Sequence, residues 1–596
     1  MAPSSRAVTS RCDERGSDTI IATRGEGGWS AAIGSSDLLA WGGFLLLVAW
    51  FLALKSYCIH WQVGDENIYY YMAWSVVDHG ALPYRDFFFA HPPLHLLPGV
   101  IAFAWLGFGP LTARCLPIGA TVVGATFLFL LAKRHLGRLA AVAAVALYLN
   151  SFEVLGDSTH WTGIDLAAMW LVMGLWALFR QRSATAGMML ALGVATSDSV
   201  LPGAVMSGLL AFLESRESAV RYALGFGVPW LAVQAGCLLL GGRNYWDSVY
   251  RFHFIKPAMA GGSFGVFAEA VTNNFAMVVG SVVGLVFVAL DEPAAKAEGN
   301  SGNAAGLWEL LRAKLLHDGP RGLARTGALW ALGYGLFIAP LPAVFSFYML
   351  PIFPGLALVG GFAVERFVHH TRGSIAAARG RTAGSWTVAR IPVLVVVACS
   401  VAFAVRVPLQ RILVPTYVRA VDVPMAWSAS PLPVNAFMRW CCWEDTARAY
   451  TGYGTFQEIL YHESRYFEQA ETLADYVRQN SRSDQVLFGD SSTTGLVALL
   501  AGRRVAADYV DTNVMRFSSG LTAAEDVIRQ VDTPALAFVL VQGRTASNAD
   551  RTSTIHYAGF ATVPAFRSWL DGHFDVAFQV EDRTKGTFIL LRRRPA

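Results

Sequence analysis

WQVGDENIYYYMAWSVVDHGALPYRDFFFAHPPLHLLP occupies residues 61–98 of the chain. This stretch directly follows the first long apolar segment, residues 36–57, and we therefore expect it to emerge at a membrane face. Its most prominent ionisable side chains are Asp65, Glu66, Arg85, Asp86 and His91. Charged groups at a membrane boundary are costly unless they pair with something or act on something. The stretch is therefore where we expect a binding or catalytic site.

The composition is typical of a membrane protein. Apolar residues make up 54% of the 596 residues and charged residues 15%, whereas soluble globular proteins carry roughly 25% charged residues. Between residues 36 and 407, apolar runs long enough for transmembrane helices recur between short polar connections. The net charge of +4 is small and spread along the chain, so it does not indicate nucleic-acid binding. The seven cysteines show no spacing typical of metal ligands.

The segment 94–109 decides the predicted topology. It has an internal proline and roughly 16 residues, fewer than the roughly 20 that a helix needs to cross a bilayer. If it lies along the membrane instead, the basic loops all face the cytoplasm, in agreement with the positive-inside rule. We therefore predict a mainly helical polytopic protein whose eleven crossings are 36–57, 111–132, 139–156, 163–179, 185–196, 200–213, 222–240, 270–290, 327–341, 344–364 and 391–407. Residues 1–35 are polar and Gly/Ser-rich, which predicts a disordered cytoplasmic tail, and residues 58–110 form the first outer loop.

The remaining residues, 408–596, are expected to form an extracytoplasmic α/β domain. Strands are predicted at 484–490, 535–543, 574–580 and 586–593, and helices at 493–502, 522–531 and 563–574. Thr522 is the predicted N-cap of the second of these helices. No catalytic constellation is recognisable in this domain, so the sequence assigns it no chemical role.

Four polar clusters fall on the predicted outer face. They are the opening stretch, GDSTHWTGID (156–165), NYWDSVYRFHFIKP (244–257) and PLPAVFSFYMLPIFP (340–354). Outside the opening stretch, the candidate side chains are Asp157, His160, Asp165, Asp247, Arg251, His253, Lys256 and Tyr348. A carboxylate can act as a general base, and fixed basic groups can stabilise charge that builds on a leaving phosphate. These residue types suit a reaction in which a hydroxyl or amine is deprotonated while an anionic group departs.

The acidic pair Asp65-Glu66 soon after the first span, followed by an amphipathic helix and an HPPL motif, resembles the membrane glycosyltransferases of the GT-C superfamily. The resemblance is strongest to protein O-mannosyltransferases and to the bacterial transferases that move aminoarabinose onto lipid A. RDFFFAHPPL (85–94) is similar to the motif in which mannosyltransferases carry an acidic residue shortly before HPPL. More weakly, Asp165 and FSFYMLPIFPGLAL (345–358) resemble the second acidic residue and the Tyr-x-x-Pro segment of that superfamily.

The resemblance covers residues 36–407 and implies an inverting transfer of a sugar from a polyprenyl-phosphate donor at the outer face. By analogy, Asp65 would be the general base that deprotonates the acceptor, and Glu66 would be the second member of the catalytic pair. The residues that the resemblance and the clusters suggest for donor or substrate binding are Arg85, Asp86, His91, Asp165, Arg251, His253, Lys256 and Tyr348. The implied partners are a polyprenyl-phosphate-linked sugar, a lipid, glycan or protein acceptor, and membrane lipids.

Two features of the family pattern stay open. Family members often have a lysine or arginine after the fifth span, where this chain has Thr196-Ser197-Asp198-Ser199 (196–199), so its set of phosphate-binding residues differs. Some relatives need a divalent cation and others do not. Mg²⁺ or Mn²⁺ held between Asp65 and Asp165 is therefore an open possibility.

Simpler interpretations compete with the catalytic one. Asp65 and Glu66 could cap the following helix. Arg85 and Asp86 could form a local ion pair, and the cations at 251–256 could contact anionic lipid headgroups. The whole chain could also be a transporter or a non-catalytic envelope assembly protein. Against transport, the acidic residues cluster at one face, whereas transporter sites lie near the midplane of the membrane.

Overall fold

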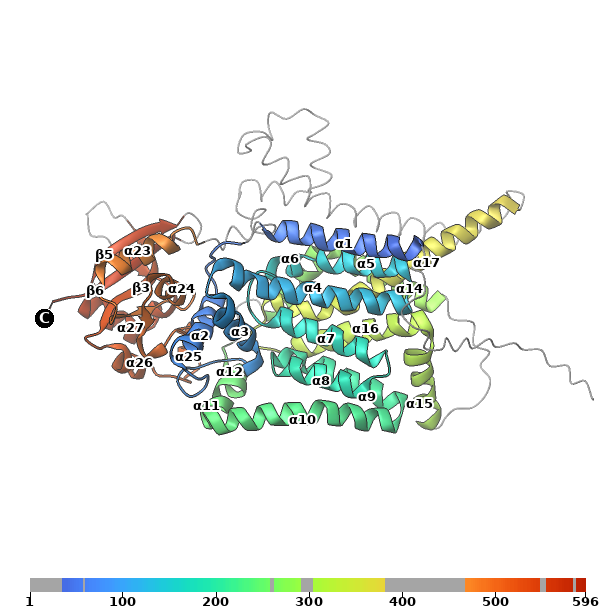
Figure 1. Ribbon diagram of the computed structural model, residues 1–596, viewed down its shortest axis with the longest axis horizontal. Coiled ribbons are helices and arrows are strands. Elements are labelled where there is room, and N and C mark those ends of the chain that lie inside the picture. The colour runs from blue at the N-terminus through green and yellow to red at the C-terminus, as the bar shows by residue number, and fades with distance from the viewer. Residues whose placement is uncertain are drawn as a thin grey trace, which may run out of the picture.

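The computed structural model describes residues 35–56, 59–257, 262–290, 304–380, 467–546, 554–582 and 586–595. Within these ranges the chain is mostly helical up to residue 380 and mixed α/β from residue 467 onward. Figure 1 shows the long helices of the first part lying roughly side by side, with the sheet of the second part beyond one end of them. The short helices α2 (Glu66–His79) and α3 (Leu97–Leu106) lie between the two parts (Figure 1).

Every predicted crossing that the structure describes coincides with helical structure. The main helices are α1 (Ser35–Ser56), α4 (Pro110–His135), α5 (Arg138–Leu149), α7 (Ile164–Leu178), α8 (Ser183–Val194), α9 (Leu201–Glu214), α10 (Arg216–Gly241), α14 (Phe275–Leu290), α16 (Gly319–Ile338) and α17 (Phe353–Gly380). Among the described residues, three stretches are long and apolar enough to cross a membrane: Pro110–His135, Arg216–Gly241 and Ser346–Thr371. The predicted count of eleven crossings is not confirmed, because the other apolar helices are shorter. The predicted tail and the eleventh crossing lie outside the described residues.

The predicted crossing at 139–156 is not one continuous helix. α5 ends at Leu149, and α6 (Phe152–Asp157) follows after a break. At the break, the side-chain Nδ2 of Asn150 donates to the carbonyl oxygen of Ala146 at 2.9 Å. The backbone N–H of Phe152 donates to Oδ1 of Asn274, which lies just before α14, at 2.8 Å. The Asn274 side chain thus satisfies a backbone N–H that an unbroken helix would satisfy itself.

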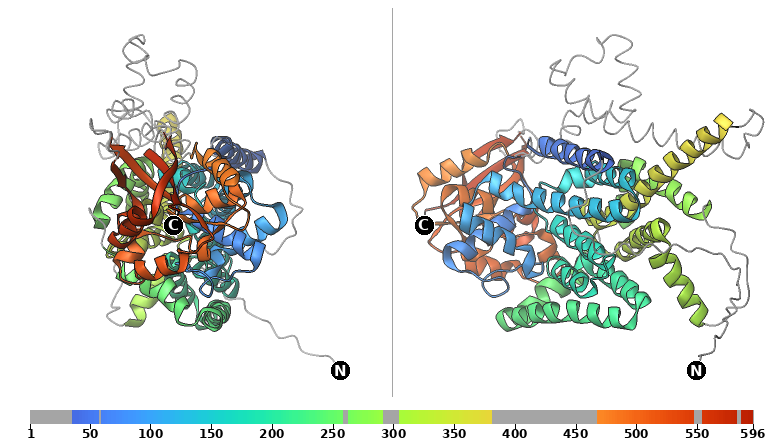
Figure 2. Two further views of the ribbon diagram at one scale, coloured as in Figure 1. Left: turned by 90° about the vertical axis from the view of Figure 1, so that its left-hand side faces the viewer. Right: turned by 45° about the vertical axis from the view of Figure 1, so that its right-hand side comes forward.

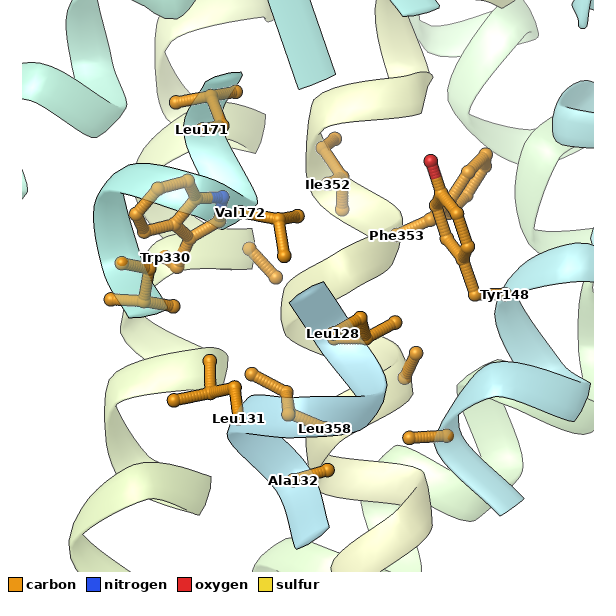
Figure 3. Close-up of a cluster of buried hydrophobic side chains, with 14 of the residues drawn as sticks. Leu128, Leu131, Ala132, Tyr148, Leu171, Val172, Trp330, Ile352, Phe353 and Leu358 are labelled. Atoms are coloured by element: carbon orange, nitrogen blue, oxygen red, sulfur yellow. The ribbon is translucent and has the colours of Figure 1, made fainter. Parts of the chain in front are cut away.

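The long helices enclose a buried apolar core. Figure 3 shows Leu128 of α4, Tyr148 of α5, Leu171 of α7, Trp330 of α16 and Leu358 of α17 converging from their separate helices. All five side chains are almost completely buried. Dense packing of this kind holds the ends of the helices, and the loops attached to them, in fixed relative positions.

The segment 94–109, expected to be too short to cross the membrane, contains a short helix that follows a 3₁₀ turn. The turn is η1 (Pro93–His95), and the helix is α3, which has 10 residues. At roughly 1.5 Å per residue α3 is only about 15 Å long, about half of the roughly 30 Å hydrocarbon layer. Trp105 and Leu106 at its end are strongly exposed. A short helix with an exposed apolar end agrees with a segment that lies along a membrane surface.

The C-terminal part contains a six-stranded sheet within the described residues. Its strands are β1 (Val486–Gly489), β2 (Arg504–Val505), β3 (Leu536–Ala546), β4 (Thr554–Tyr557), β5 (Phe574–Asp582) and β6 (Gly586–Arg593). Their order is β2-β1-β3-β6-β5, with β4 paired to β3. β1 runs parallel to β2 and β3, and the other pairs are antiparallel. The predicted α/β character of this part agrees with the structure.

Helices pack around this sheet, and one predicted detail of them is wrong. The helices are α23 (Ala470–Asn480), α24 (Thr494–Ala501), α25 (Val514–Ser518), α26 (Ala524–Val531) and α27 (Pro564–His573). Thr522 was the predicted N-cap of α26, but Ala523 occupies that position. The hydroxyl of Thr522 instead accepts a hydrogen bond from Nε of Arg516 at 3.1 Å. A tertiary partner has thus replaced the local capping bond.

The C-terminal part is fixed to α2 by polar contacts. The hydroxyl of Tyr71 donates to Oδ1 of Asp508 at 2.9 Å and accepts from the backbone N–H of Val505 at 2.8 Å. The backbone N–H of Gly64 donates to the carbonyl oxygen of Ser492 at 3.3 Å. In Figure 2 (right), the blue segment that contains α2 lies against the orange and red C-terminal part. The C-terminal part is therefore bonded both to α2 and to the residue just before its N-cap.

Candidate active site

Asp65 stands at the N-terminus of α2. It occupies the N-cap position with φ −62° and ψ −21°, but its side chain makes no capping hydrogen bond, and the residue is exposed. The capping role that the sequence left open is therefore not the role of this side chain. The partial positive charge of a helix N-terminus favours an ionised carboxylate at this position. Asp65 also lies close enough to Lys256 and Tyr348 to interact with them electrostatically.

Glu66, the next residue, is completely buried. Its Oε1 accepts a hydrogen bond from Nη1 of Arg114 at 2.9 Å, and its Oε2 contacts Nε2 of His160. Arg114, on α4, is also completely buried and donates to the carbonyl oxygen of Thr159 at 2.7 Å. A buried ion pair specifies one geometry, and removing one partner leaves an uncompensated charge. Glu66 therefore fixes the start of α2, and with it Asp65, against α4.

His91 lies in an aromatic environment beside α2. Its Nε2 is 2.8 Å from the hydroxyl of Tyr69, and its ring centroid is 4.6 Å from that of His95. The hydroxyl of Tyr84 donates to the carbonyl oxygen of His91 at 2.7 Å. Burial lowers the pKa of His91 well below its usual value, with contributions from His95 and His253, and burial raises the pKa of Tyr69. Both side chains are thus neutral near pH 7, so His91 offers hydrogen bonds and not a fixed positive charge.

His253, in the loop after α10, lies next to the HPPL segment. This loop contains α11 (Arg243–Trp246), the π-helical turn η3 (Asp247–Arg251) and α12 (Phe252–Ile255). Nε2 of His253 lies 2.8 Å from the carbonyl oxygen of Ala90, the residue before His91. Burial lowers the pKa of His253 to about 4. His253 is therefore neutral at pH 7 as well, and it ties the loop to the HPPL segment.

Lys256, three residues after His253, supplies positive charge near the HPPL segment. Its Nζ lies 4.6 Å from the ring centroid of Phe252. Burial lowers its pKa to about 8, while the carboxylates of Asp511 and Asp65 act in the opposite direction. With a pKa of about 8, most molecules still carry the ammonium charge at pH 7. Lys256 is thus a partly desolvated cation within electrostatic range of the exposed Asp65 carboxylate.

Tyr348 lies in η5 (Ser346–Ile352), directly before α17. Its ring packs edge-on against Phe347 at 4.9 Å and Phe345 at 5.8 Å. Together with the residues above it completes what we call the Asp65 cluster, whose members are Asp65, Tyr69, His91, His253, Lys256 and Tyr348. The cluster draws on three segments far apart in the sequence: 65–91, 253–256 and 348.

Four of the predicted binding residues lie outside the Asp65 cluster: Arg85, Asp86, Arg251 and Asp165. Nη2 of Arg85 pairs with Oδ2 of Asp86 at 2.7 Å, and this oxygen also accepts from the backbone N–H of Leu82 at 2.8 Å. Arg251 pairs with Asp247 at 3.4 Å. The side chains of Arg85 and Arg251 are about half exposed. Within the described ranges, Arg85, Asp86 and Arg251 form no hydrogen bond or ion pair with members of the cluster, and the pairing of Arg85 with Asp86 agrees with the local ion pair that the sequence also allowed.

Asp165 lies apart from Asp65, in a buried polar layer at the start of α7. Its Oδ1 accepts from the hydroxyl of Thr121 at 3.3 Å, and Asp157 and Lys55 are its charged neighbours. Within the described ranges, no group of three or more His, Cys, Asp or Glu side chains is arranged to hold a metal ion. A divalent cation shared between Asp65 and Asp165 stays a prediction.

Three residues of the site were not among the predicted ones. Tyr69 belongs to the run Tyr69-Tyr70-Tyr71, in which nothing in the local sequence distinguishes it from the two tyrosines that follow. Arg114 lies near the start of a predicted crossing, where an arginine in an apolar run is itself a functional signal. Asp511 comes from the C-terminal part, where nothing in the local sequence distinguishes it from other loop carboxylates. Only Arg114 could have been found from the sequence.

Solved structures show which architecture this is. The crystal structure of ArnT from Cupriavidus metallidurans bound to undecaprenyl phosphate is similar at a TM-score of 0.55 and 16% identity, covering 92% of this chain and 98% of that one. The crystal structure of the same protein in its apo state is similar at a TM-score of 0.55 and 17% identity, covering 93% of this chain and 98% of that one. ArnT is a membrane glycosyltransferase of the GT-C superfamily. This chain has the GT-C fold.

The GT-C fold was expected from the Asp65-Glu66 pair and the HPPL motif, and that expectation is confirmed. The archaeal oligosaccharyltransferase AglB from Archaeoglobus fulgidus, in complex with an inhibitory peptide and a dolichol-phosphate, has a TM-score of 0.45 at 13% identity, with 91% of this chain and 80% of that chain covered. No protein-family model and no curated protein sequence matches the chain. In this GT-C fold, α2 and α12, which carry members of the Asp65 cluster, lie where the long helices meet the C-terminal part (Figure 1).

Proposed function

We propose that this chain is a membrane glycosyltransferase that moves a sugar from a polyprenyl-phosphate donor to an acceptor, with inversion at the anomeric carbon. The observation that carries the proposal is an exposed carboxylate, Asp65, within electrostatic range of a partly buried cation, Lys256, on a GT-C fold. ArnT, which shares the fold, has been crystallised with undecaprenyl phosphate. That ligand supports a polyprenyl-phosphate carrier for the donor.

Asp65 acts as the general base in this proposal. The acceptor hydroxyl or amine gives its proton to the carboxylate while its oxygen or nitrogen forms a bond to the anomeric carbon. The bond from that carbon to the phosphate oxygen breaks, and the lipid phosphate leaves with the electron pair. A single displacement of this kind inverts the configuration. The exposure of Asp65 and its position at a helix N-terminus favour the ionised form that a base needs.

Lys256 stabilises the departing phosphate. A charged donor in a partly desolvated place gains more from a developing negative charge than it would in water. The neutral side chains of His91, His253 and Tyr69 add hydrogen bonds without further charge. This arrangement replaces the larger set of basic residues that the sequence suggested with one cation and several neutral donors.

Glu66 has a supporting role in the proposal. Its carboxylate is buried and paired with Arg114 and His160, so it is shielded from a substrate and holds α2 in place. We also propose that the Asp65 cluster and the C-terminal part face the extracytoplasmic side while the N-terminus is cytoplasmic. The distribution of basic loops supports this orientation.

The experiment that tests the proposal compares Asp65→Asn with the wild type. Both proteins are purified in lipid nanodiscs and supplied with a panel of polyprenyl-phosphate sugars, and loss of donor and release of polyprenyl phosphate are measured. We expect Asp65→Asn to abolish transfer while binding of undecaprenyl phosphate persists. The matched control is Asp78→Asn, an exposed carboxylate at the other end of α2 that pairs with Arg504.

The proposal fails on a clear outcome. It is refuted if the wild type transfers no sugar from any donor in the panel and the cellular glycan profile is the same with Asp65→Asn as with the wild type. If the wild type does transfer sugar, profiling of surface glycolipids and glycoproteins in cells that lack the protein would identify the class of acceptor.

A further inference from the structure

The C-terminal part brings a buried arginine to the edge of the candidate site. Arg516, on α25, is only 7% exposed. The central carbon of its guanidinium lies 4.0 Å from the ring centroid of Phe88 and 4.5 Å from that of Tyr509. Phe88 belongs to the RDFFFAHPPL motif, three residues before His91. Arg516 is therefore in direct contact with the segment that carries the HPPL motif.

The hydrogen bonds of Arg516 go to neutral acceptors. Its Nε donates to the hydroxyl of Thr522 at 3.1 Å, and its Nη1 donates to the backbone carbonyl of Asp511 at 3.1 Å. Within the described ranges no ion pair is formed by this guanidinium, and its Nη2 has no hydrogen-bond partner there. The carboxylate of Asp511 is close enough to act on the pKa of Arg516, but the larger effect is burial, which lowers that pKa. A buried charge with only neutral partners is costly, and an anion that binds to it would remove that cost.

An aromatic pair connects Arg516 to Lys256. The ring of Phe88 lies edge-on to that of Phe252, with 5.5 Å between the centroids. Lys256 stands over the other ring, with Nζ 4.6 Å from the centroid of Phe252. The two cations therefore flank one pair of rings, although one belongs to the C-terminal part and the other to the loop after α10. An anionic group beside these rings would meet positive charge from both parts of the chain.

We propose that the C-terminal part completes the transfer site and that Arg516 binds an oxyanion of one of the two substrates. This inference rests on the proposed glycosyltransferase function. A guanidinium suits the task because it stays charged when desolvated and presents parallel N–H groups to a phosphate or carboxylate. The oxyanion belongs either to the phosphate of the lipid donor or to an acidic group of the acceptor, and the experiment separates these sources.

The test uses Arg516→Gln and Arg516→Lys in the full-length protein. Affinity for undecaprenyl phosphate is measured directly, and KM is measured separately for the donor and the acceptor. We expect Arg516→Gln to weaken the binding of one of the two substrates by roughly ten- to a hundredfold. This is the range for the loss of a hydrogen bond to a charged group. Arg516→Lys keeps the charge and should recover part of the loss. Weaker binding of undecaprenyl phosphate assigns the oxyanion to the donor, and a raised acceptor KM alone assigns it to the acceptor.

A control separates binding from docking. Arg504→Gln removes an exposed ion pair with Asp78, at 3.0 Å, that also joins the C-terminal part to α2. This variant should leave both KM values unchanged. If Arg516 only holds the two parts together, Arg516→Gln lowers the yield of folded protein or kcat but leaves both KM values unchanged, and Arg516→Lys restores nothing. That result overturns the inference. An inactive wild type would instead refute the proposed function itself.

Discussion

A rise in pH from 7 to 9 should remove most of the phosphate stabilisation that Lys256 provides. Burial lowers the pKa of this lysine from 10.5 to about 8. With that pKa, about nine in ten molecules carry the ammonium charge at pH 7, about half at pH 8 and about one in ten at pH 9. An ordinary exposed lysine would stay almost fully charged across this range. A step that needs the charged form should therefore slow about tenfold between pH 7 and pH 9.

The assay for this prediction is the pH dependence of kcat/KM for the lipid donor, measured in initial rates with purified protein. Lys256→Arg keeps its charge at all these pH values, so its profile should be flat above pH 7. Asp511→Asn removes a carboxylate that raises the pKa of Lys256. In that variant the loss of rate should begin at a lower pH than in the wild type. A wild-type profile that stays level to about pH 9.5, or the same decline in Lys256→Arg, would show that Lys256 is not the titrating group.

Three further predictions concern stability and the residues outside the cluster. Replacing Arg114 with Met leaves Glu66 buried without its cation and should cost about 3–5 kcal/mol of stability, measured as a lower Tm; an unchanged Tm would contradict the pairing. Tyr71→Phe removes the two hydrogen bonds to Asp508 and Val505 and should cost about 1–3 kcal/mol, seen as faster proteolysis between the two parts, whereas equal proteolysis rates would mean that these bonds do not hold the parts together. Arg85→Gln should leave kcat/KM within about twofold because an exposed ion pair contributes little, and a tenfold loss would place Arg85 at the substrate after all.

The fold was largely predictable because its signals are local. Membrane-spanning length, apolar composition and the distribution of basic loops are properties of consecutive residues. They located the helices and identified 94–109 as too short to cross. Four of the six described strands, β1, β3, β5 and β6, were also predicted from short apolar runs between turns, whereas the short strands β2 and β4 were missed. The break between α5 and α6 was missed because it depends on Asn274, more than a hundred residues away.

The site was only partly predictable because the role of a charged side chain depends on its neighbours in space. Asp65 and Glu66 are adjacent and chemically alike, yet one is exposed and the other is buried against Arg114. Arg251 and Lys256 come from one loop, but only Lys256 joins the cluster.

The sequence by itself determined the membrane class and the resemblance to the GT-C superfamily, because hydropathy and motif spacing are properties of consecutive residues. Only the tertiary structure decided that Asp65 is exposed while Glu66 is buried, and that Lys256 lies within electrostatic range of Asp65. It also brought Asp511 and Arg516 from the C-terminal part to the same place. The physical reason is that burial and charge pairing are set by contacts between distant segments, and these contacts exist only in the folded chain.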